Sequence, residues 1–220
     1  MKGVIFDWDG VVIDSSAQHE RSWELLAEEI QKPLPSGHFK AGFGKKNQEI
    51  IPGLLRWSEE PAEIRRLGER KEELYRELVR EQGVTVLPGA RELLEALMAA
   101  SIPRSVGSST PRSNLDAIFA ATGLGELFNA VVCGDDVTNG KPAPDVFLLA
   151  AERLGFNPAD CLVIEDAHVG IEAAHRAGMK VLAVATTHPL EELARADAAV
   201  LSLAGILPDY LNEVWMSAKR

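Results

Sequence analysis

Acidic side chains follow two short apolar runs in this 220-residue chain. Asp7 and Asp9 come at the end of the first run, and Glu165 and Asp166 come at the end of a second run that begins at Cys161. Such runs are typical of buried parallel strands, whose carboxyl ends meet at one edge of a sheet. The carboxylates are therefore expected to converge, and a hard cation is expected to balance their repulsion.

Two serines and a lysine occupy comparable positions. Ser108 and Ser109 follow another predicted strand, where hydroxyl and backbone N–H groups can hold a phosphate oxygen. The alternative is that these serines cap the helix expected near Asn114. Lys141 stands before two prolines that fix the approach of the next helix, so we expect its ammonium group to be buried and to pair with Asp7 and with a phosphate.

The elements that would position these groups alternate between strand and helix after residue 84. The patterns predict helices over 90–100, 114–122, 146–154 and 169–177, and strands over 104–107, 130–133, 161–164, 181–185 and 199–201. This alternation predicts an α/β fold in which a doubly wound parallel sheet is covered on both faces.

The stretch between residues 15 and 83 has a different pattern. It contains no convincing strand and favours helices over 17–31, 48–57 and 62–82. We therefore predict a core domain of residues 1–14 and 84–220, into which a helical cap domain of residues 15–83 is inserted. Such an insertion would stand over the strand ends, where open α/β sheets bind ligands, and could act as a lid.

Composition excludes several classes of function. The formal net charge of −10 argues against a protein that neutralises nucleic acid phosphates. No apolar run reaches the roughly 18 residues of a membrane span, and the N-terminus lacks a signal-peptide pattern, so we expect a cytoplasmic protein. Cys133 and Cys161 match neither a disulfide framework nor a metal-binding spacing. A small molecule is the expected partner, and a monomer is compatible with a sequence that specifies no oligomeric state.

Taken together, the motifs resemble those of the haloacid dehalogenase superfamily. The matching segments span nearly the whole chain: residues 7–10, Ser108, residues 141–144, and Glu165 with Asp166. Within that superfamily, His19, Trp23 and residues 87–89 and 167–174 look most like the β-phosphoglucomutase and sugar-phosphatase branch. The resemblance implies a Rossmann-like core with a helical-bundle cap, and a Mg²⁺-dependent phosphatase acting on a small phosphorylated metabolite, in the first place a sugar phosphate.

The resemblance also implies roles for the core residues. Asp7 would attack phosphorus and form an aspartyl-phosphate, while Asp9 would protonate the leaving oxygen and then activate water. Ser108 and Lys141 would hold the phosphoryl oxygens. Asp9 favours phosphoryl transfer over dehalogenation, because the dehalogenases of the superfamily lack an acid at that position.

The magnesium ligands implied by the resemblance come from the same motifs. The Asp7 carboxylate, the Asp9 backbone carbonyl and Asp166 would hold Mg²⁺, with Glu165 in support.

Four cap residues are candidate substrate contacts, each with a structural alternative. His19 could bond the general acid or pack on the first cap helix. Lys45 and Lys46 could reach the non-reacting part of the substrate or lie in a solvated turn; their segment, 42–47, lacks the length and the Ser or Thr of a phosphate-binding P-loop. Lys71 could contact a phosphate, although we favour a routine i,i+4 pair on a charged helix.

Two other activities are weighed against the phosphatase. A β-phosphoglucomutase-type mutase would carry a lysine shortly after the motif serine, where this sequence has Pro111, so we favour hydrolysis. A phosphoacceptor signalling domain also combines an acidic pocket, a hydroxyl and a lysine, but it needs neither a cap nor Asp9. His168 and His175 lie seven residues apart without a third metal ligand nearby in the sequence, and we interpret them as structural.

Overall fold

The computed structural model describes residues 1–42 and 45–217. Its centre is a parallel sheet with the strand order β5-β4-β1-β6-β7-β8. The strands are β1 (Gly3–Phe6), β4 (Arg104–Gly107), β5 (Ala130–Val132), β6 (Cys161–Glu165), β7 (Lys180–Val184) and β8 (Ala198–Val200). The predicted strand ranges differ by one residue at several ends, most visibly at Leu201, which lies outside β8 and is 73% exposed.

Successive side chains of β1 enter two separate hydrophobic clusters, because side chains alternate across a strand. Val4 and Phe6 belong to one cluster and Ile5 to the other, and all three are fully buried. Helices α5 (Ala90–Ala99), α6 (Arg112–Thr122) and α9 (Pro208–Met216) pack on the first cluster, and α7 (Asp145–Leu154) and α8 (His168–Arg176) pack on the second. The sheet is therefore covered on both faces, as predicted, although α9 was not anticipated from the sequence.

The helices between the first strand and α5 form the inserted cap. They are α1 (Ser16–Ile30), α2 (His38–Gly42), α3 (Asn47–Glu49) and α4 (Pro61–Gln82), with a π-helical turn at Ile50–Leu55. The cap has a hydrophobic cluster of its own, centred on Trp23, Leu26, Ile51 and Leu67. The predicted helix over 48–57 is divided into α3 and the π-helical turn; Pro52, which lacks the amide hydrogen that a regular helix needs, lies within that turn.

Helix α4 shows how the cap sequence specifies its shape. Pro61 occupies the first helical position, and the side chain of Glu60 accepts a hydrogen bond from the amide of Glu63. The buried residues recur at helical spacing: Leu67, Lys71, Leu74, Tyr75 and Leu78. This stripe packs against α1, which makes the α1–α4 pair the frame of the cap.

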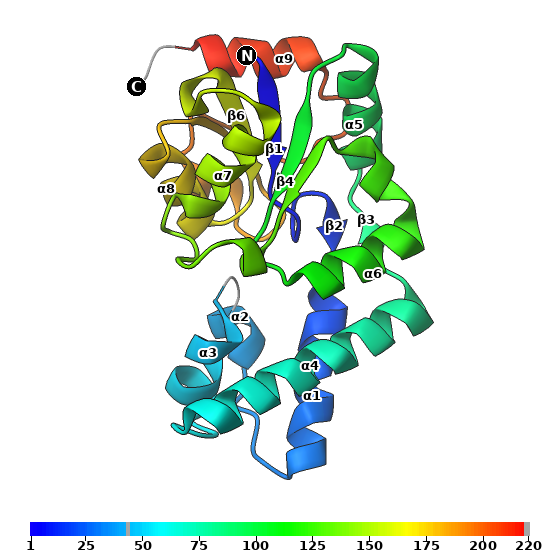
Figure 1. The fold of residues 1–220 in the computed structure, drawn as a ribbon, viewed down its shortest axis with the longest axis vertical. Helices are drawn as coiled ribbons and strands as arrows, with labels where there is room; N and C mark the ends of the chain where they lie inside the picture. Colours follow the sequence, from blue (N-terminus) through cyan, green and yellow to red (C-terminus); the bar gives the residue numbers. More distant parts are fainter. Residues whose placement is uncertain (43–44, 218–220) are drawn as a thin grey trace.

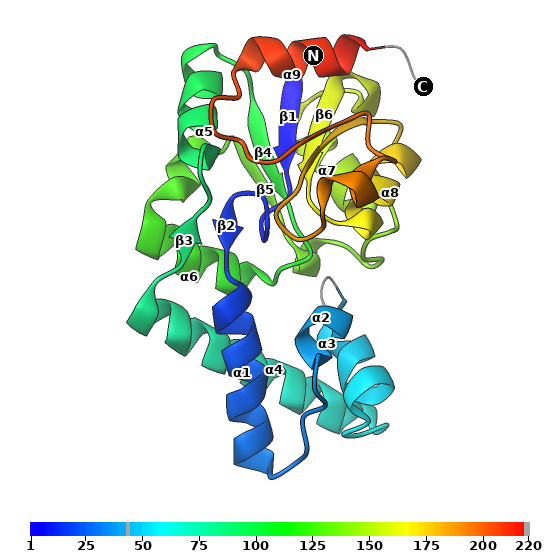
Figure 2. The ribbon, with the colours of Figure 1, turned by 180° about the vertical axis from the view of Figure 1, so that it is seen from behind.

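The cap joins the core through a short two-stranded antiparallel sheet of β2 (Ile13–Asp14) and β3 (Thr85–Val86). Ile13 pairs with Val86, and Asp14 pairs with Thr85. The outgoing and returning connections therefore run side by side. Figure 1 shows the cap helices beyond one end of the strands and α9, with the N-terminus, at the opposite end; Figure 2 shows the same arrangement from behind.

The predicted domain boundaries, at residues 14/15 and 83/84, remain proposals, and residues 218–220 of the predicted core lie outside the described part. Among the described residues, none of the helices has both the length and the apolar composition needed to cross a membrane.

Candidate active site

The ends of three adjacent strands bring the predicted core residues together. Asp7 follows β1, Ser108 follows β4, and Asp166 follows Glu165, the last residue of β6. Because β1 lies between β4 and β6, Asp7 stands in the middle of this row. The Asp7 amide donates to the carbonyl of Ile164 (2.9 Å), which extends the pairing of β1 and β6 up to the site.

Lys141 joins two of the carboxylates. Its Nζ lies 2.6 Å from Asp7 Oδ1 and 2.7 Å from Glu165 Oε1. All three side chains are largely buried. Burial by itself lowers the pKa of Lys141, but the charges of Asp7 and Glu165 outweigh burial and raise it. The lysine therefore carries a fixed positive charge beside Asp7, as the sequence predicted.

Glu165 is held on both of its oxygens. Oε1 accepts from Lys141, while Oε2 accepts from the amides of Asp166 and Ala167 at 2.7 Å each. A Cβ at position 170 would overlap Glu165 Oε1, so Gly170 leaves the space that this carboxylate fills. These contacts suit a residue that positions Lys141 and the start of α8.

Asp7, Glu165 and Asp166 also form a buried acidic cluster, in which one oxygen from each lies within 4.8 Å of the others. Burial raises the pKa of Asp7, with Lys141 opposing the shift and Glu165 adding to it. The pKa of Asp166 is raised well above its ordinary value, chiefly by burial and further by the negative charges of Glu165 and Asp7. One ammonium group does not offset three carboxylates, and oxygen donors are the ligands that Mg²⁺ prefers, so this donor set fits a hard divalent cation.

Gly10 and Thr187 shape the surroundings of Asp166. Gly10 has a φ of +83°, and a Cβ there would overlap Asp166 Oδ2, so the turn after Asp9 requires glycine. The Thr187 hydroxyl donates a short hydrogen bond to the same oxygen. Sequence reasoning missed Thr187, although it follows β7 and the argument from strand ends applied to it equally.

Asp9 faces the junction of cap and core rather than Lys141. Its Oδ1 accepts from the Ser15 hydroxyl (2.5 Å), and its Oδ2 accepts from the Thr110 hydroxyl (2.5 Å). His19 Nε2 lies 3.7 Å from Oδ1. Burial raises the pKa of Asp9, but His19 and the two hydroxyl groups outweigh burial and lower it to about 2. Asp9 is thus ionised in this arrangement.

Lys71 contacts His19 and its chain neighbour Glu72, which corrects the interpretation of this residue as a routine i,i+4 partner. It is 3% exposed, and its Nζ lies 2.7 Å from His19 Nδ1 and 3.1 Å from Glu72 Oε1. The Lys71 Nζ lies 5.5 Å from the centroid of the Trp23 ring and 5.4 Å from that of Tyr75. Helix α4 turns the stripe that contains Lys71 toward α1, so the contacts of Lys71 depend on how these two helices pack.

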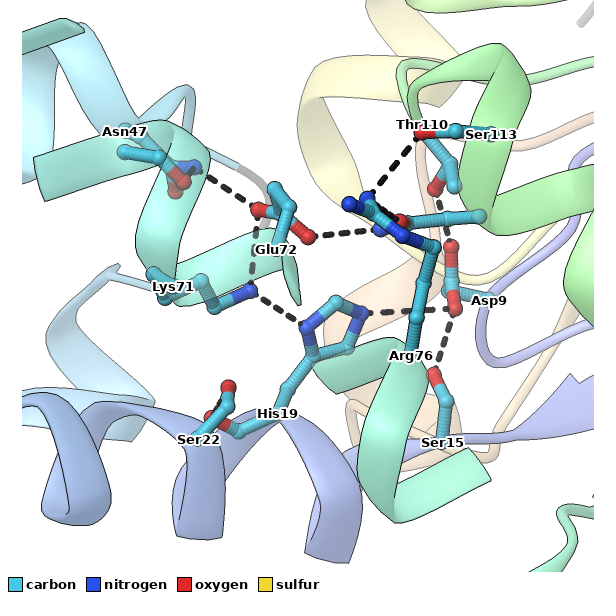
Figure 3. A network of polar contacts seen from close by, with 12 residues as sticks. Asp9, Ser15, His19, Ser22, Asn47, Lys71, Glu72, Arg76, Thr110 and Ser113 are labelled. Atoms are coloured by element: carbon cyan, nitrogen blue, oxygen red, sulfur yellow. Dashed lines mark hydrogen bonds and ion pairs between the residues drawn. The ribbon is translucent and has the colours of Figure 1, made fainter. Parts of the chain in front are cut away.

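His19 packs within the cap and also lies near Asp9, but the 3.7 Å between Nε2 and Oδ1 is longer than a hydrogen bond, so its action on the general acid stays a prediction. The ring stacks on Tyr75 with the centroids 4.0 Å apart, and it also lies between Lys71 and Asp9. Figure 3 shows the continuous series of contacts from Glu72 through Lys71 and His19 to Asp9.

Glu72 extends that series across the junction and was not singled out from the sequence. It accepts from Asn47 of the cap (Nδ2–Oε1, 2.7 Å) and from Asn114 of the core (Nδ2–Oε2, 2.6 Å). Arg76, one turn further along α4, donates to Asn114 Oδ1 (2.9 Å) and to Ser113 (3.1 Å). No local signal marks these residues, because their meeting depends on how the cap docks on α6.

The predicted site residues share one cleft of about 800 Å³. Its lining includes Asp7, Asp9, His19, Lys45, Lys46, Lys71, Ser108, Ser109, Lys141, Glu165 and Asp166. Lys46 reaches the core, since a Cβ on Gly140 would lie 2.7 Å from its Cε. Phe43 and Gly44, in the middle of the predicted specificity segment, lie outside the described residues.

The two serines do not cap α6. Pro111 is the N-cap residue of that helix and makes no side-chain capping bond, so the helix-cap interpretation is wrong. Ser108 is 2% exposed, and its hydroxyl accepts from the Thr110 amide at 3.0 Å. Both serines line the cleft, and Thr110, immediately after them, is the hydroxyl that contacts Asp9.

A family model described as haloacid dehalogenase-like hydrolase matches residues 1–178. The chain belongs to the haloacid dehalogenase-like hydrolase family. This confirms the resemblance inferred from the four motifs, and the protein is an enzyme of that family. The match begins at the strand that carries Asp7 and extends past α8, so it contains the predicted core residues Asp7, Asp9, Ser108, Ser109, Lys141, Glu165 and Asp166, whereas Thr187 lies beyond it.

Individual members of this hydrolase family are similar over most of the chain. A 5-amino-6-(5-phospho-D-ribitylamino)uracil phosphatase of Arabidopsis thaliana is 38% identical over 91% of this chain, which spans only 54% of that protein. A β-phosphoglucomutase of Bacillus subtilis is 32% identical, with 98% of this chain and 96% of that protein covered. The crystal structure of a family IA hydrolase from Entamoeba histolytica has a TM-score of 0.90 at 28% identity, covering 99% of this chain and 100% of the other.

Proposed function

We propose that this haloacid dehalogenase-like hydrolase is a Mg²⁺-dependent phosphatase of a small phosphorylated metabolite, with a sugar phosphate or a polyol phosphate as the first candidate. The observation that carries the proposal is the contact of Lys141 with Asp7, 2.6 Å long, beside Asp166 at the end of the sheet. Relatives support the choice of a phosphatase, among them a fructose-1-phosphate phosphatase of Escherichia coli that is 32% identical over 83% of this chain.

Asp7 is the proposed nucleophile. A carboxylate oxygen of Asp7 attacks phosphorus, the bond from phosphorus to the ester oxygen breaks, and Asp9 gives a proton to the departing alcohol. Water then attacks the aspartyl-phosphate, Asp9 accepts its proton, and inorganic phosphate leaves Asp7 restored. The low pKa of Asp9 suits the second step, which needs the ionised carboxylate. In the first step Asp9 must carry a proton, so its present hydrogen bonds must give way to the leaving oxygen.

The phosphoryl group would lie between Lys141 and the serines. The Lys141 ammonium group can hold one phosphoryl oxygen, and the Ser108 and Ser109 groups can hold another. Because Lys141 is fixed by Glu165 as well as by Asp7, its position does not depend on the substrate.

The proposed metal ligands are the Asp7 and Asp166 carboxylates and the Asp9 backbone carbonyl, with Glu165 acting through Lys141. When bound, the cation neutralises charge on the phosphoryl oxygens and on the nucleophile. The repulsion among the three buried carboxylates favours binding of the cation even without substrate.

The cap is the proposed specificity element. Lys45 and Lys46 line the same cleft as Asp7, on its cap side, and are candidates to contact the non-reacting part of the substrate. His19 and Lys71 are proposed to act on the substrate indirectly, through Asp9. A cytoplasmic location stays a prediction from the N-terminal sequence.

A phosphosugar mutase is the second candidate, favoured by the full-length similarity to the Bacillus subtilis β-phosphoglucomutase. Against it, Pro111, the N-cap residue of α6, stands where a mutase would carry a lysine shortly after the motif serine. A phosphoacceptor domain without turnover is disfavoured, because the cap and Asp9 have no role in such a protein.

The decisive experiment is a panel of phosphate-release assays with and without Mg²⁺. The panel contains fructose 1-phosphate, other hexose and pentose phosphates, polyol phosphates and a phosphoribityl compound. The conversion of β-glucose 1-phosphate to glucose 6-phosphate is followed in parallel. Mg²⁺-dependent release of phosphate supports the phosphatase; isomer conversion with little free phosphate supports the mutase; a stable phosphoprotein without turnover contradicts both.

A further inference from the structure

Two histidines and a glutamate gather beside the acidic cluster but outside it. His168 begins α8, His188 lies in the connection after β7, and Glu192 lies in the 3-10 turn Leu190–Leu193. Each offers a ligand atom, and these atoms all lie within 4.8 Å of one another. His188 and Glu192 lie 20 and 24 residues after His168, so no local sequence pattern relates them to it.

The geometry of this triad suits a transition metal ion. Glu192 Oε2 lies 3.5 Å from His188 Nδ1 and 3.8 Å from His168 Nε2. With bonds of about 2.0–2.1 Å from Zn²⁺ to nitrogen or oxygen, neighbouring ligands of a tetrahedral site lie about 3.3–3.5 Å apart. Small side-chain rotations therefore bring all three atoms to one ion and leave a further position for water.

The ligand chemistry separates this triad from the carboxylate cluster. Imidazole nitrogens suit Zn²⁺, Ni²⁺ and Cu²⁺, whereas Mg²⁺ prefers oxygen ligands only. The side chains of His168, His188 and Glu192 are 41%, 29% and 55% exposed, so an ion can reach them. Within the described residues, the contacts of these two histidines are with each other and with Glu192, at a ring-centroid separation of 4.3 Å for the histidine pair.

We propose that His168, His188 and Glu192 form a second metal site, specific for Zn²⁺-like ions and distinct from the Mg²⁺ site. An ion there fastens the connection after β7 to the first turn of α8. Thr186 and Thr187 in the same connection donate hydrogen bonds to the Gly10 carbonyl and to Asp166. The second site therefore stabilises the connection after β7, which contacts Gly10 and Asp166 of the first site. This effect does not depend on whether the protein is a phosphatase.

Zinc binding to the tag-free protein tests the proposal directly. Titration against a chromogenic Zn²⁺ chelator is performed in millimolar Mg²⁺, which keeps the carboxylate cluster occupied. We expect one Zn²⁺ per chain. Because changes outside the ligand shell already weaken metal affinity about 10- to 100-fold, His188→Asn and Glu192→Gln should each weaken binding at least about tenfold.

His175→Asn is the matched control. His175 is exposed on the same helix but contacts Asp197 (3.2 Å) instead of the triad, so its replacement should leave zinc affinity unchanged. Circular dichroism establishes that each variant is folded. In the wild-type protein, Zn²⁺ should also slow hydrogen exchange in residues 185–193. The proposal is overturned if the wild-type protein shows no saturable zinc binding, or if His188→Asn and Glu192→Gln bind zinc as tightly as His175→Asn.

Discussion

Asn114 of the core donates a hydrogen bond to Glu72 of the cap, with 2.6 Å between Nδ2 and Oε2. Asn114 is fully buried, and Arg76 donates to its side-chain oxygen from the next turn of α4. The Glu72 carboxylate also accepts from Lys71, which in turn contacts His19 beside Asp9. Docking of the cap and the setting of the proposed general acid therefore depend on the same side chains.

Asn114→Asp should weaken cap docking. The change removes the donor and places a second carboxylate next to Glu72, and leaving a buried polar group without its partner costs about 1–3 kcal/mol. We expect kcat/KM to fall about 5- to 150-fold, since about 1.4 kcal/mol is a factor of ten. Steady-state kinetics measure the effect. Ser113→Ala removes only one contact of Arg76 and should change kcat/KM by less than about threefold; equal effects of the two changes would contradict this account.

Glu72→Gln should alter how stability depends on pH. Burial raises the pKa of Glu72, but Lys71, His19 and the two asparagines outweigh burial and lower it to about 2, from 4.5 in the unfolded chain. A lowered pKa in the folded state stabilises the protein above pH 4.5, and this stabilisation is lost as pH falls from 4.5 toward 2.

The measurement is urea unfolding of wild type and Glu72→Gln across that range. The difference in the free energy of unfolding should be greatest above about pH 4.5 and should shrink by about 3 kcal/mol near pH 2. Glu81→Gln, at an exposed position near the end of the same helix, is the control. If the difference in the free energy of unfolding between wild type and Glu72→Gln does not change with pH, the charge of Glu72 does not stabilise the fold.

Asp7→Asn should abolish phosphate release while the fold is retained. The amide keeps the shape of the side chain and can still meet Lys141, but it is not a nucleophile. We expect a loss of at least about a thousandfold in kcat, measured with the best substrate of the panel, with an unchanged circular dichroism spectrum. Asp116→Asn, at an exposed ion pair with Arg112, should retain full activity. Activity of Asp7→Asn within tenfold of wild type would remove Asp7 from the mechanism.

Removal of Mg²⁺ should destabilise the protein most at neutral and higher pH. Burial is the main cause of the raised pKa values of Asp7 and Asp166, so the folded state binds more protons than the unfolded chain, and stability falls as pH rises above the unfolded value of 3.8. A cation offsets this loss. At a Mg²⁺ concentration about 100 times its Kd, the gain is about 2.7 kcal/mol, or roughly 5–10 °C in Tm.

Thermal unfolding with Mg²⁺ or with a chelator tests this expectation at about pH 5 and about pH 8, where the effect should be smaller and larger respectively. Asp166→Asn should lose most of the Mg²⁺ effect, and Asp160→Asn, a surface partner of Lys2, should keep it. An Asp166→Asn variant that Mg²⁺ still stabilises fully would exclude Asp166 as a ligand.

Sequence reasoning succeeded where chemistry follows from position along a strand. Asp7, Ser108 and Asp166 each come at or just after the end of a predicted strand, and the parallel pairing of these strands brings such positions together. The pairing of Lys141 with Asp7 was predicted on other grounds, from the two prolines that fix the approach of the next helix. The sequence also predicted that helices cover both faces of the sheet, because continuous apolar strands need cover on both sides.

Contacts that depend on docking between distant elements could not be predicted from the sequence. Lys71 was interpreted as a partner in an i,i+4 pair because α4 is rich in charge, whereas its contact with His19 follows from the packing of α4 on α1. Glu72 and Asn114 lie 42 residues apart on separate helices, and no local pattern relates them. The zinc ligand candidates His168 and His188 were likewise separated by a complete strand, β7.

The pairing of β2 with β3 makes the cap separable from the core. Asp14 and Thr85 are cross-strand partners, so a short hairpin turn could link them in place of the whole insertion. Every core motif residue would remain on such a chain, while the cap contacts proposed for the substrate would be absent. The architecture is modular: exchanging one contiguous segment can change which molecules are accepted while the reacting groups stay in place.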